Sequence, residues 1–304
     1  MRIAIVQDSP VYNDLAGTTE KTLSIIDKAA QEKTELIVFG ESWLSGYPFW
    51  LDVCADVAVW DHPPVQSVWS NMYDNSVDIA AGDLNPITER LASYQMMAVI
   101  GLNEIISTGK GNRTIYNSVI IIDASGKIVN HHRKLMPTYT EKLVYGLGDG
   151  HGLNSVETKG GRLGALICWE HWMPMARMAM HDASEDIHIA LWPYVKEMHQ
   201  IACRQYAIEG RCNVIAVGQI ARKTDIPNGL ELSPNVEVGD FLLRGGSVIY
   251  DATGSALTEP VYDIEKTIYF DLPTNDKGKF IDLSVSGHYQ RPDIFKYSVN
   301  KERE

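Results

Sequence analysis

Three side chains of reactive type follow apolar runs in this sequence. Glu41 follows Leu36–Phe39 and Cys168 follows Leu163–Ile167, and both runs have the composition of buried strands. Lys134 follows a third, less regular run. Ligands of α/β proteins bind beyond the carboxyl ends of strands, where such residues lie. A thiol, a carboxylate and an ammonium group together suit attack on an electrophilic carbon. The carboxylate takes the thiol proton, and the cation stabilises the negative charge that develops.

Each of the three residues also has an ordinary structural interpretation. A lone cysteine at the end of an apolar strand is most often a small core residue. A glutamate after a strand is usually in the first turn of a helix, and a lysine beside Arg133 is usually a solvated charge. The catalytic hypothesis therefore depends on the three residues taken together and on the residues that flank them.

The elements that must position these residues alternate between strands and helices. Strands at 3–6 and 36–39 enclose a helix at 18–30, for which Thr18 or Thr19 is the expected N-cap. This β-α-β start predicts parallel pairing through a right-handed crossover. Further strands are predicted at 97–102, 116–122, 127–131, 163–168, 187–191, 213–217, 246–250 and 266–271, and further helices at 85–94, 173–183 and 197–210.

The pattern predicts an α/β fold with mixed sheets, because hairpins interrupt the alternation of strands and helices. One such hairpin turns at residues 123–126. The stretch 41–83 is rich in Trp, Tyr and Pro without a clear period, and we expect loops and short helices there. No linker or repeat divides the chain, so we expect a single domain over 1–304. A short charged C-terminal tail at about 298–304 is expected to fray.

Composition restricts the partners and the compartment of this protein. The chain has 27 Lys plus Arg against 39 Asp plus Glu, a net charge of −12, and it has no basic block. We therefore expect no nucleic-acid or membrane partner and favour a small neutral substrate. No apolar run approaches the roughly 20 residues that span a bilayer, and residues 1–8 do not form a signal sequence, which predicts a cytoplasmic protein.

The cysteines and histidines predict neither disulfides nor a metal site. The four cysteines form no C-x-x-C pair, so free thiols are expected. His171 and His181 lie ten residues apart without a carboxylate at a ligand spacing, and we reject a metal site there. His171 is interpreted as an ordinary buried histidine, or as one that orients a neighbour or faces the substrate. No metal and no organic cofactor is expected.

Four segments of the sequence resemble the nitrilase superfamily. Residues 39–48 (FGESWLSGYP) resemble its first signature, 132–138 (HRKLMPT) its lysine signature and 168–174 (CWEHWMP) its cysteine signature, in the same order. Residues 287–293 (GHYQRPD) resemble the C-terminal end of the nitrilase branch. Three signatures in order are far more specific than any one of them.

The resemblance implies a four-layer α-β-β-α sandwich and an assembly through helices, here a homodimer or short homo-oligomer. It implies that Glu41 is the general base, that Lys134 stabilises the tetrahedral intermediate and that Cys168 is the nucleophile. Glu141 fits a second glutamate of the family. The presence of the whole triad argues against a non-enzymatic scaffold of the same fold.

The residues after Cys168 bear on the substrate. Trp169 and Glu170 resemble the nitrilase branch, whereas amidase branches more often have Tyr or Phe followed by Asp. The loop 142–150 also resembles the nitrilase branch, although Tyr145 departs from its commoner Trp or Phe. The resemblance thus implies a nitrilase that converts an organic nitrile to the carboxylic acid and ammonia through a thioimidate and a thioester. The alternative is an amidase, or a cyanide-hydrolysing enzyme, of the same superfamily.

Aromatic residues concentrate in the part of the chain that carries the triad. All seven tryptophans lie between Trp43 and Trp192. An aromatic wall would suit an aryl or arylaliphatic nitrile. The equally weighted alternative is that most of these rings pack in the core or at a subunit interface. The expected substrate-binding residues, of which Trp192 is the strongest candidate, are Tyr47, Tyr145, Trp169, Trp172, Trp192 and Pro193.

Overall fold

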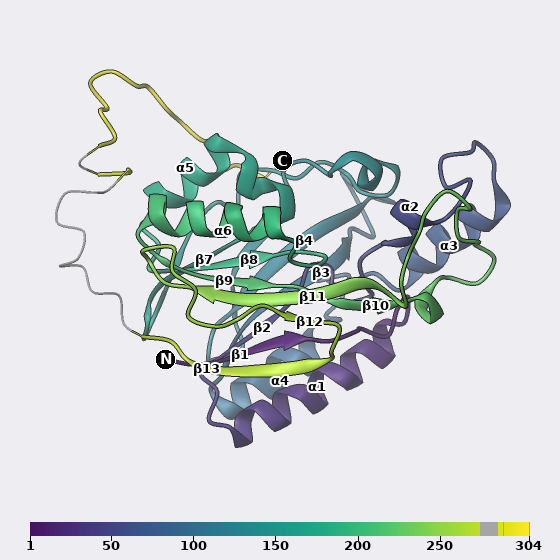
Figure 1. Ribbon diagram of the computed structural model, residues 1–304, viewed down its shortest axis with the longest axis horizontal. Coiled ribbons are helices and arrows are strands. Elements are labelled where there is room, and N and C mark those ends of the chain that lie inside the picture. The colour runs from purple at the N-terminus through teal and green to yellow at the C-terminus, as the bar shows by residue number, and fades with distance from the viewer. Residues whose placement is uncertain (274–284, 288, 304) are drawn as a thin grey trace.

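Two β-sheets pack face to face in the computed structural model, which describes residues 1–273, 285–287 and 289–303 (Figure 1). The first sheet has the order β13-β1-β2-β3-β4-β5, with bounds Lys266–Asp271, Arg2–Gln7, Leu36–Phe39, Met97–Ile105, Ile115–Ile122 and Ile128–Arg133. The second has the order β10-β11-β9-β8-β7-β6, with bounds Ile220–Arg222, Phe241–Tyr250, Asn213–Val217, Ile187–Leu191, Gly161–Ile167 and Val156–Thr158. The short strand β12 (Val261–Tyr262) pairs with β11.

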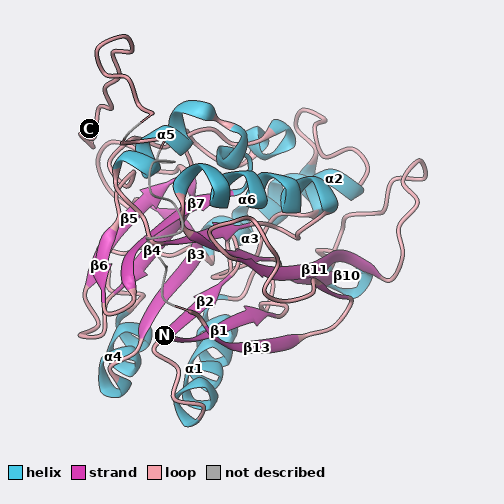
Figure 2. Ribbon diagram, turned by 60° about the vertical axis from the view of Figure 1, so that its left-hand side comes forward, coloured by secondary structure: helices cyan, strands magenta, loops and turns pink. Residues whose placement is uncertain are grey.

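Helices cover the outer face of each sheet, as Figure 2 shows. Helices α1 (Leu15–Gln31) and α4 (Asn85–Tyr94) cover the first sheet, and α5 (Pro174–Asp182) and α6 (Glu197–Gly210) cover the second. The layers are therefore α-β-β-α, as the resemblance implies. Two further helices, α2 (Trp50–Val53) and α3 (Pro63–Asp74), lie together at one end of the sandwich.

Strand β1 shows why the layers form. Ile3 and Ile5 belong to the core between the two sheets. Ala4 and Val6 belong to the core between the first sheet and its helices. Successive side chains of a strand point to opposite faces, so a strand that is apolar at every position is buried on both sides.

Both sheets mix parallel and antiparallel pairs, which confirms the predicted α/β class with mixed sheets. In the first sheet β1, β2 and β3 are parallel, whereas β3–β4 and β4–β5 are antiparallel. In the second sheet β7, β8 and β9 are parallel. The parallel strands bring their carboxyl ends to one edge of each sheet, where the site residues of the next section lie.

The expected start and N-cap of the first helix differ from the structure. Helix α1 begins three residues before Thr18, and its N-cap is Asp14, whose Oδ1 accepts from the Gly17 N–H at 2.8 Å. Thr18 is instead buried and donates to the Val11 carbonyl oxygen. In the expected tail, Arg303 donates to Asp149 Oδ2 at 2.8 Å and to the His131 carbonyl at 3.0 Å, and fraying of this segment stays a prediction.

Two residues of the predicted C-terminal features, His288 and Glu304, lie outside the described residues. Among the helices of the described ranges, none combines the length and the apolar character that crossing a bilayer requires.

Candidate active site

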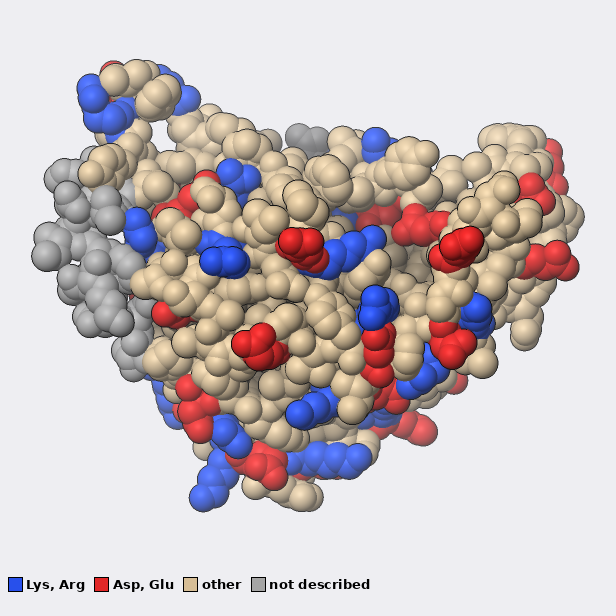
Figure 3. All heavy atoms as spheres, in the orientation of Figure 1, with Lys and Arg blue, Asp and Glu red and all other residues tan. Residues whose placement is uncertain are grey.

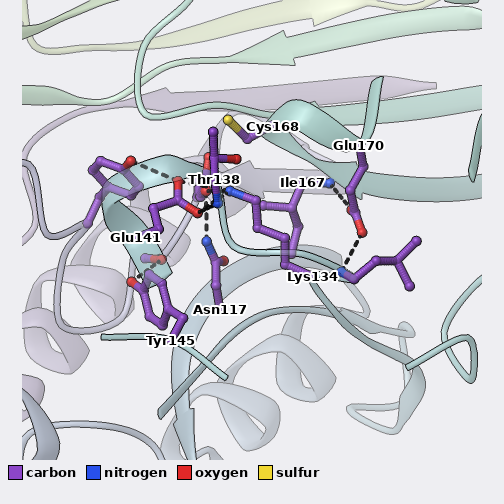
Figure 4. A network of polar contacts seen from close by, with 12 residues as sticks. Asn117, Lys134, Thr138, Glu141, Tyr145, Ile167, Cys168 and Glu170 are labelled. Atoms are coloured by element: carbon purple, nitrogen blue, oxygen red, sulfur yellow. Dashed lines mark hydrogen bonds and ion pairs between the residues drawn. The ribbon is translucent and has the colours of Figure 1, made fainter. Parts of the chain in front are cut away.

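Glu41, Lys134 and Cys168 converge between the two sheets. Figure 4 shows Lys134 and Cys168 in this cluster, together with Glu141. Glu41 follows β2 and Lys134 follows β5, both in the first sheet, whereas Cys168 follows β7 in the second. All three are buried, with exposed fractions of 0%, 1% and 7%. The two sheets therefore supply the carboxylate and the thiol from opposite sides of one small space.

The Lys134 ammonium group lies between two carboxylates. Its Nζ donates to Glu41 Oε1 at 3.0 Å and to Glu141 Oε2 at 2.7 Å. Glu141 belongs to the 3₁₀ turn η1 (Tyr139–Leu143), where its Oε2 also accepts from the Thr138 N–H at 2.8 Å. The structure thus brings the predicted Glu141 to Lys134, and the capping interaction of η1 fixes its orientation.

The two oxygens of Glu41 have different surroundings. Oε1 accepts from Asn117 Nδ2 at 2.7 Å and from Lys134. Oε2 is buried and has no hydrogen-bond partner among the described residues. Single ligand atoms of Glu41, Glu141 and Cys168 lie within 4.8 Å of one another. The hydrogen bonds of Oε1 therefore fix the orientation of the Glu41 carboxylate, and Oε2 is available to accept a proton.

This cluster has the residue types of a metal site, but a cation is already part of it. The Lys134 ammonium hydrogen-bonds both carboxylates and supplies the positive charge that they need. The arrangement is therefore suited to acid–base and nucleophilic chemistry with the chain's own groups.

Burial and charge set the protonation states of the site. Burial raises the pKa of Glu41 to about 7, against the opposing effect of Lys134. Burial also raises the pKa of the Cys168 thiol well above its usual range. For Lys134, burial alone would lower the pKa, but the negative charges of Cys168, Glu141 and Glu41 raise it. At neutral pH the thiol keeps its proton, and Glu41 titrates in the range where a general base works best.

The backbone of Cys168 is held in a conformation that is rare for this residue type. Its φ is 51°, in the left-handed region, where β7 ends and the 3₁₀ turn η2 (Cys168–Trp172) begins. The backbone N–H of Trp169 lies beside the sulfur, and its effect on the pKa of the thiol is to lower it, against the larger effect of burial. This donor is suited to stabilise negative charge beside the sulfur.

Glu170 ties the cysteine turn to the lysine loop. Its Oε2 accepts from the Ile167 N–H at 2.7 Å, and its Oε1 accepts from the Leu135 N–H at 2.8 Å (Figure 4). The His132 ring lies 2.9 Å from the same carboxylate. Sequence reasoning missed this structural role of Glu170 and that of Asn117. The one feature of the sequence that could have indicated the role of Glu170 is its position two residues after Cys168.

Gly101 explains how closely the strands approach at the site. A Cβ at this position of β3 would lie 2.3 Å from the Gly40 carbonyl oxygen and 2.9 Å from the Glu41 Cα. Only glycine allows β3 to pack against the backbone that carries Glu41. Sequence reasoning gave no indication of this role.

The predicted pocket residues have different surroundings. Tyr47 is buried and its hydroxyl donates to Glu141 Oε1 at 2.8 Å, so it is part of the charged cluster. Tyr145 is also buried, and its hydroxyl donates to Asn103 Oδ1 at 2.6 Å. Pro193 is half-buried, and its carbonyl oxygen accepts from the Gln219 N–H at 2.9 Å.

The tryptophans divide between surface and core. Trp169 is 52% exposed, and its ring lies 4.7 Å from that of Trp172. Trp192 is completely buried and stacks on His199 at 4.2 Å. Trp192 belongs to the same buried cluster as Cys168, and its place in a substrate pocket stays a prediction. Trp169 follows Cys168 directly in the chain and offers exposed surface there.

An apolar cavity of about 470 Å³ lies beside η1. Trp50, Trp60 and Trp69 supply its aromatic wall, and Leu143 and Val144 supply the side next to η1. The sequence did not single out these three tryptophans. None of the three reactive residues lines the described wall of this cavity.

The chain is similar to known proteins over nearly its whole length. Residues 2–281 match the family model described as carbon-nitrogen hydrolase. The chain is 31% identical over 303 residues to an aliphatic nitrilase of Sinorhizobium fredii, covering 99% of this chain and 96% of that protein. It is 29% identical to a bifunctional nitrilase/nitrile hydratase of Lupinus angustifolius, covering 98% and 86%. XC1258 of Xanthomonas campestris, described as a CN-hydrolase superfamily protein, has a similar structure, with a TM-score of 0.67, 17% identity and 99% of each chain covered.

Proposed function

Because the chain belongs to the carbon-nitrogen hydrolase family, it hydrolyses carbon–nitrogen bonds, and we propose that its substrate is an organic nitrile. The observation that carries the proposal is the buried cluster in which the Cys168 sulfur lies beside the carboxylates of Glu41 and Glu141, with the Lys134 ammonium between them. In this proposal Cys168 is the nucleophile, Glu41 the general base and Lys134 the group that stabilises negative charge. The nitrilase names of the relatives favour a nitrile over an amide.

The first step joins the sulfur to the nitrile carbon. Glu41 Oε2 takes the Cys168 thiol proton while the sulfur attacks, so that the S–H bond breaks and an S–C bond forms. The proton then passes to the nitrogen, and the product is a neutral thioimidate. Lys134 and the Trp169 N–H meet the negative charge that develops, in a site from which most water is excluded.

Two water molecules complete the reaction. The first adds to the thioimidate carbon with Glu41 or Glu141 as base, and the C–N bond then breaks to release ammonia and leave a thioester. The second attacks the thioester carbon, breaks the S–C bond and returns the proton to Cys168. The net reaction consumes one nitrile and two waters and yields one carboxylic acid and one ammonia.

We further propose a neutral substrate with an aryl or arylaliphatic group. The Tyr47 hydroxyl donates to Glu141 of the buried cluster, and Trp169, which is half-exposed, follows Cys168 directly in the chain. A neutral substrate is consistent with the net charge of −12. On the face shown in Figure 3, acidic and basic side chains are interspersed.

We also propose that the enzyme is a cytoplasmic homodimer or short homo-oligomer. The four cysteines are free and buried, which is consistent with a reducing compartment. The outer helices α5 and α6 expose Met175, Met198, Ile201 and Ile208, each at least 40% exposed. Such a face would be covered if two copies packed through these helices.

Ammonia release from matched substrates tests the proposed function. We expect release from phenylacetonitrile or from a small aliphatic dinitrile, but not from phenylacetamide, with the Cys168→Ala variant as the blank. Preference for phenylacetonitrile would support the aromatic pocket. Release from the amide alone would move the enzyme to the amidases. Conversion of the nitrile without ammonia release would identify a hydratase.

The pH dependence of kcat/KM reports the ionisation of Glu41. The active form needs the Glu41 carboxylate ionised and the Cys168 thiol protonated, and burial raises the pKa of Glu41 to about 7. We therefore expect kcat/KM to fall about tenfold per pH unit below this pH, and to be constant above it until the Cys168 thiol ionises. A profile that stays flat down to the usual range of carboxyl groups would contradict the role of Glu41.

A further inference from the structure

A chain of buried hydrogen bonds leads away from the backbone of Cys168. The His171 Nδ1 atom lies 2.7 Å from the Cys168 carbonyl oxygen, and the His171 Nε2 atom lies 3.0 Å from His188 Nε2. His188 Nδ1 lies 2.8 Å from Glu185 Oε1, and the Tyr206 hydroxyl donates to Glu185 Oε2. None of the five residues is more than 7% exposed. The proposed mechanism uses only the first of them.

The position of every proton in this chain follows from its first bond. A carbonyl oxygen only accepts, so His171 Nδ1 carries a hydrogen, and Nε2 of the neutral ring is an acceptor. His188 Nε2 must therefore donate, which leaves His188 Nδ1 as the acceptor. Glu185 Oε1 must then donate, so Glu185 is a protonated carboxylic acid.

The surroundings support this neutral form over an ionised Glu185 beside a charged His188. Burial raises the pKa of Glu185 to about 8 and lowers the pKa of His188 well below its usual range. Burial likewise lowers the pKa of His171 to about 3. The titratable and charged groups around this region are paired with one another: Glu209 with Arg177 at 2.7 Å and with His181 at 3.4 Å, and Glu170 with His132 at 2.9 Å.

This series of hydrogen bonds ends on the peptide group that joins Cys168 to Trp169. A trans peptide is planar, and its C=O and N–H point in opposite directions. The C=O of this peptide is held by His171, and its N–H faces the Cys168 sulfur. Fixing the carbonyl therefore fixes the donor that stabilises negative charge at the sulfur.

We propose that His171, His188 and Glu185 form a positioning relay, which holds the Cys168–Trp169 peptide so that the Trp169 N–H stays directed at the reacting sulfur. The proposal rests on the proposed role of Cys168 as nucleophile. The backbone of Cys168 has a φ of 51°, a conformation of higher energy for this residue type, and the hydrogen bond from His171 stabilises it. Packing adds to that support, since His188 stacks on Tyr206 at 3.8 Å.

Two substitutions of Glu185 separate the relay from ordinary packing. In Glu185→Gln the amide NH₂ can donate to His188 and the amide oxygen can accept from Tyr206, as in the protonated acid. We expect kcat of this variant to stay within about twofold of the wild type. Glu185→Leu has a similar volume but cannot donate, and we expect kcat to fall about tenfold or more with little change in KM. His171→Phe should lower kcat by about 100-fold.

A second measurement does not depend on the substrate. Alkylation of Cys168 by iodoacetamide, followed by the mass of its peptide, reports the ionisation of the thiol. Loss of the Trp169 N–H contact should move the alkylation profile to higher pH in Glu185→Leu and His171→Phe, but not in Glu185→Gln. Thr22→Val removes a buried hydrogen bond with Trp43 on the first sheet and is the control for lost stability alone.

The outcomes separate the relay from the proposed function. An unchanged kcat and an unchanged alkylation profile in folded Glu185→Leu or His171→Phe would overturn the relay. A kcat of Glu185→Gln as low as that of Glu185→Leu would also overturn it. If Glu185→Leu does not fold, infrared spectra of the wild type and of Glu185→Gln test the relay instead. The relay predicts a protonated-carboxyl band in the wild type that is missing from Glu185→Gln. Its absence from the wild type overturns the relay. Shifted alkylation without ammonia release from any nitrile would support the relay and contradict the proposed substrate.

Discussion

Replacing Cys168 with alanine is expected to lower kcat for nitrile hydrolysis by about 10⁴-fold or more, because no other group in the site can form the covalent intermediate. The other reactive groups, Glu41 and Lys134, would keep their contacts with each other. The free energy of unfolding should fall by only about 1 kcal/mol, since the substitution removes a single sulfur atom from a buried side chain. Ammonia release and urea unfolding followed by circular dichroism measure the two quantities.

Cys203→Ala is the matched control for this experiment. Cys203 is completely buried, lies in α6 and is free, and its printed polar neighbour is Trp192 rather than Glu41, Lys134 or Glu141. We expect this variant to lose about as much stability as Cys168→Ala while kcat stays unchanged. Turnover by Cys168→Ala above the level of a protein-free blank would disprove the covalent mechanism.

Lys134→Met is expected to have the second-largest effect, on both activity and stability. It removes the ammonium group and leaves Glu41 and Glu141 buried and close together. Breaking one side of a buried ion pair costs about 3–5 kcal/mol of unfolding free energy. The rate should fall by at least about 10²- to 10³-fold, since a donor aimed at the developing charge is lost.

The loss of stability in Lys134→Met should depend on pH in a defined direction. Without the ammonium, the pKa of the buried Glu41, already about 7, rises further. The native state then binds more protons than the unfolded chain, so stability falls as pH rises and recovers as pH falls. Urea unfolding on both sides of pH 7 measures this trend.

A double variant separates charge from chemistry. Adding Glu141→Gln to Lys134→Met removes one of the two unpaired carboxylates, and we expect it to restore part of the stability without restoring activity. Wild-type kcat in Lys134→Met would contradict the role assigned to this residue. An unchanged stability at all pH values would contradict the buried ion pair.

Local patterns in the sequence predicted most of the regular elements. The bounds of α6, β8 and β9 agree with the expected 197–210, 187–191 and 213–217. These segments carry a complete signal, either a run of Ile and Val bounded by polar residues or apolar residues at helical spacing. The short strands β6, β10 and β12 were missed, because two or three residues carry no period and become strands only by pairing with a neighbour.

The site was predicted in part. Glu41, Lys134 and Cys168 were identified by residue type, by their positions after apolar runs and by their flanking residues, and Glu141 by resemblance. Trp192 stays a predicted pocket residue, because a position beside a strand end is the same for a pocket wall as for the core. The structure buries it completely.

The sequence by itself determined the fold class, the order of the reactive residues and the lack of a run of basic residues, because these depend on residue type and on neighbours within a few positions. Only the tertiary structure decided which groups meet. Asn117 is 76 residues from Glu41, and Glu185 is joined to Cys168 only through two histidines. Hydrogen bonds are short and directional, so a partner brought in from another strand cannot be read from local pattern. The protonation states depend on burial by those same partners, and for this reason they too belong to the folded molecule.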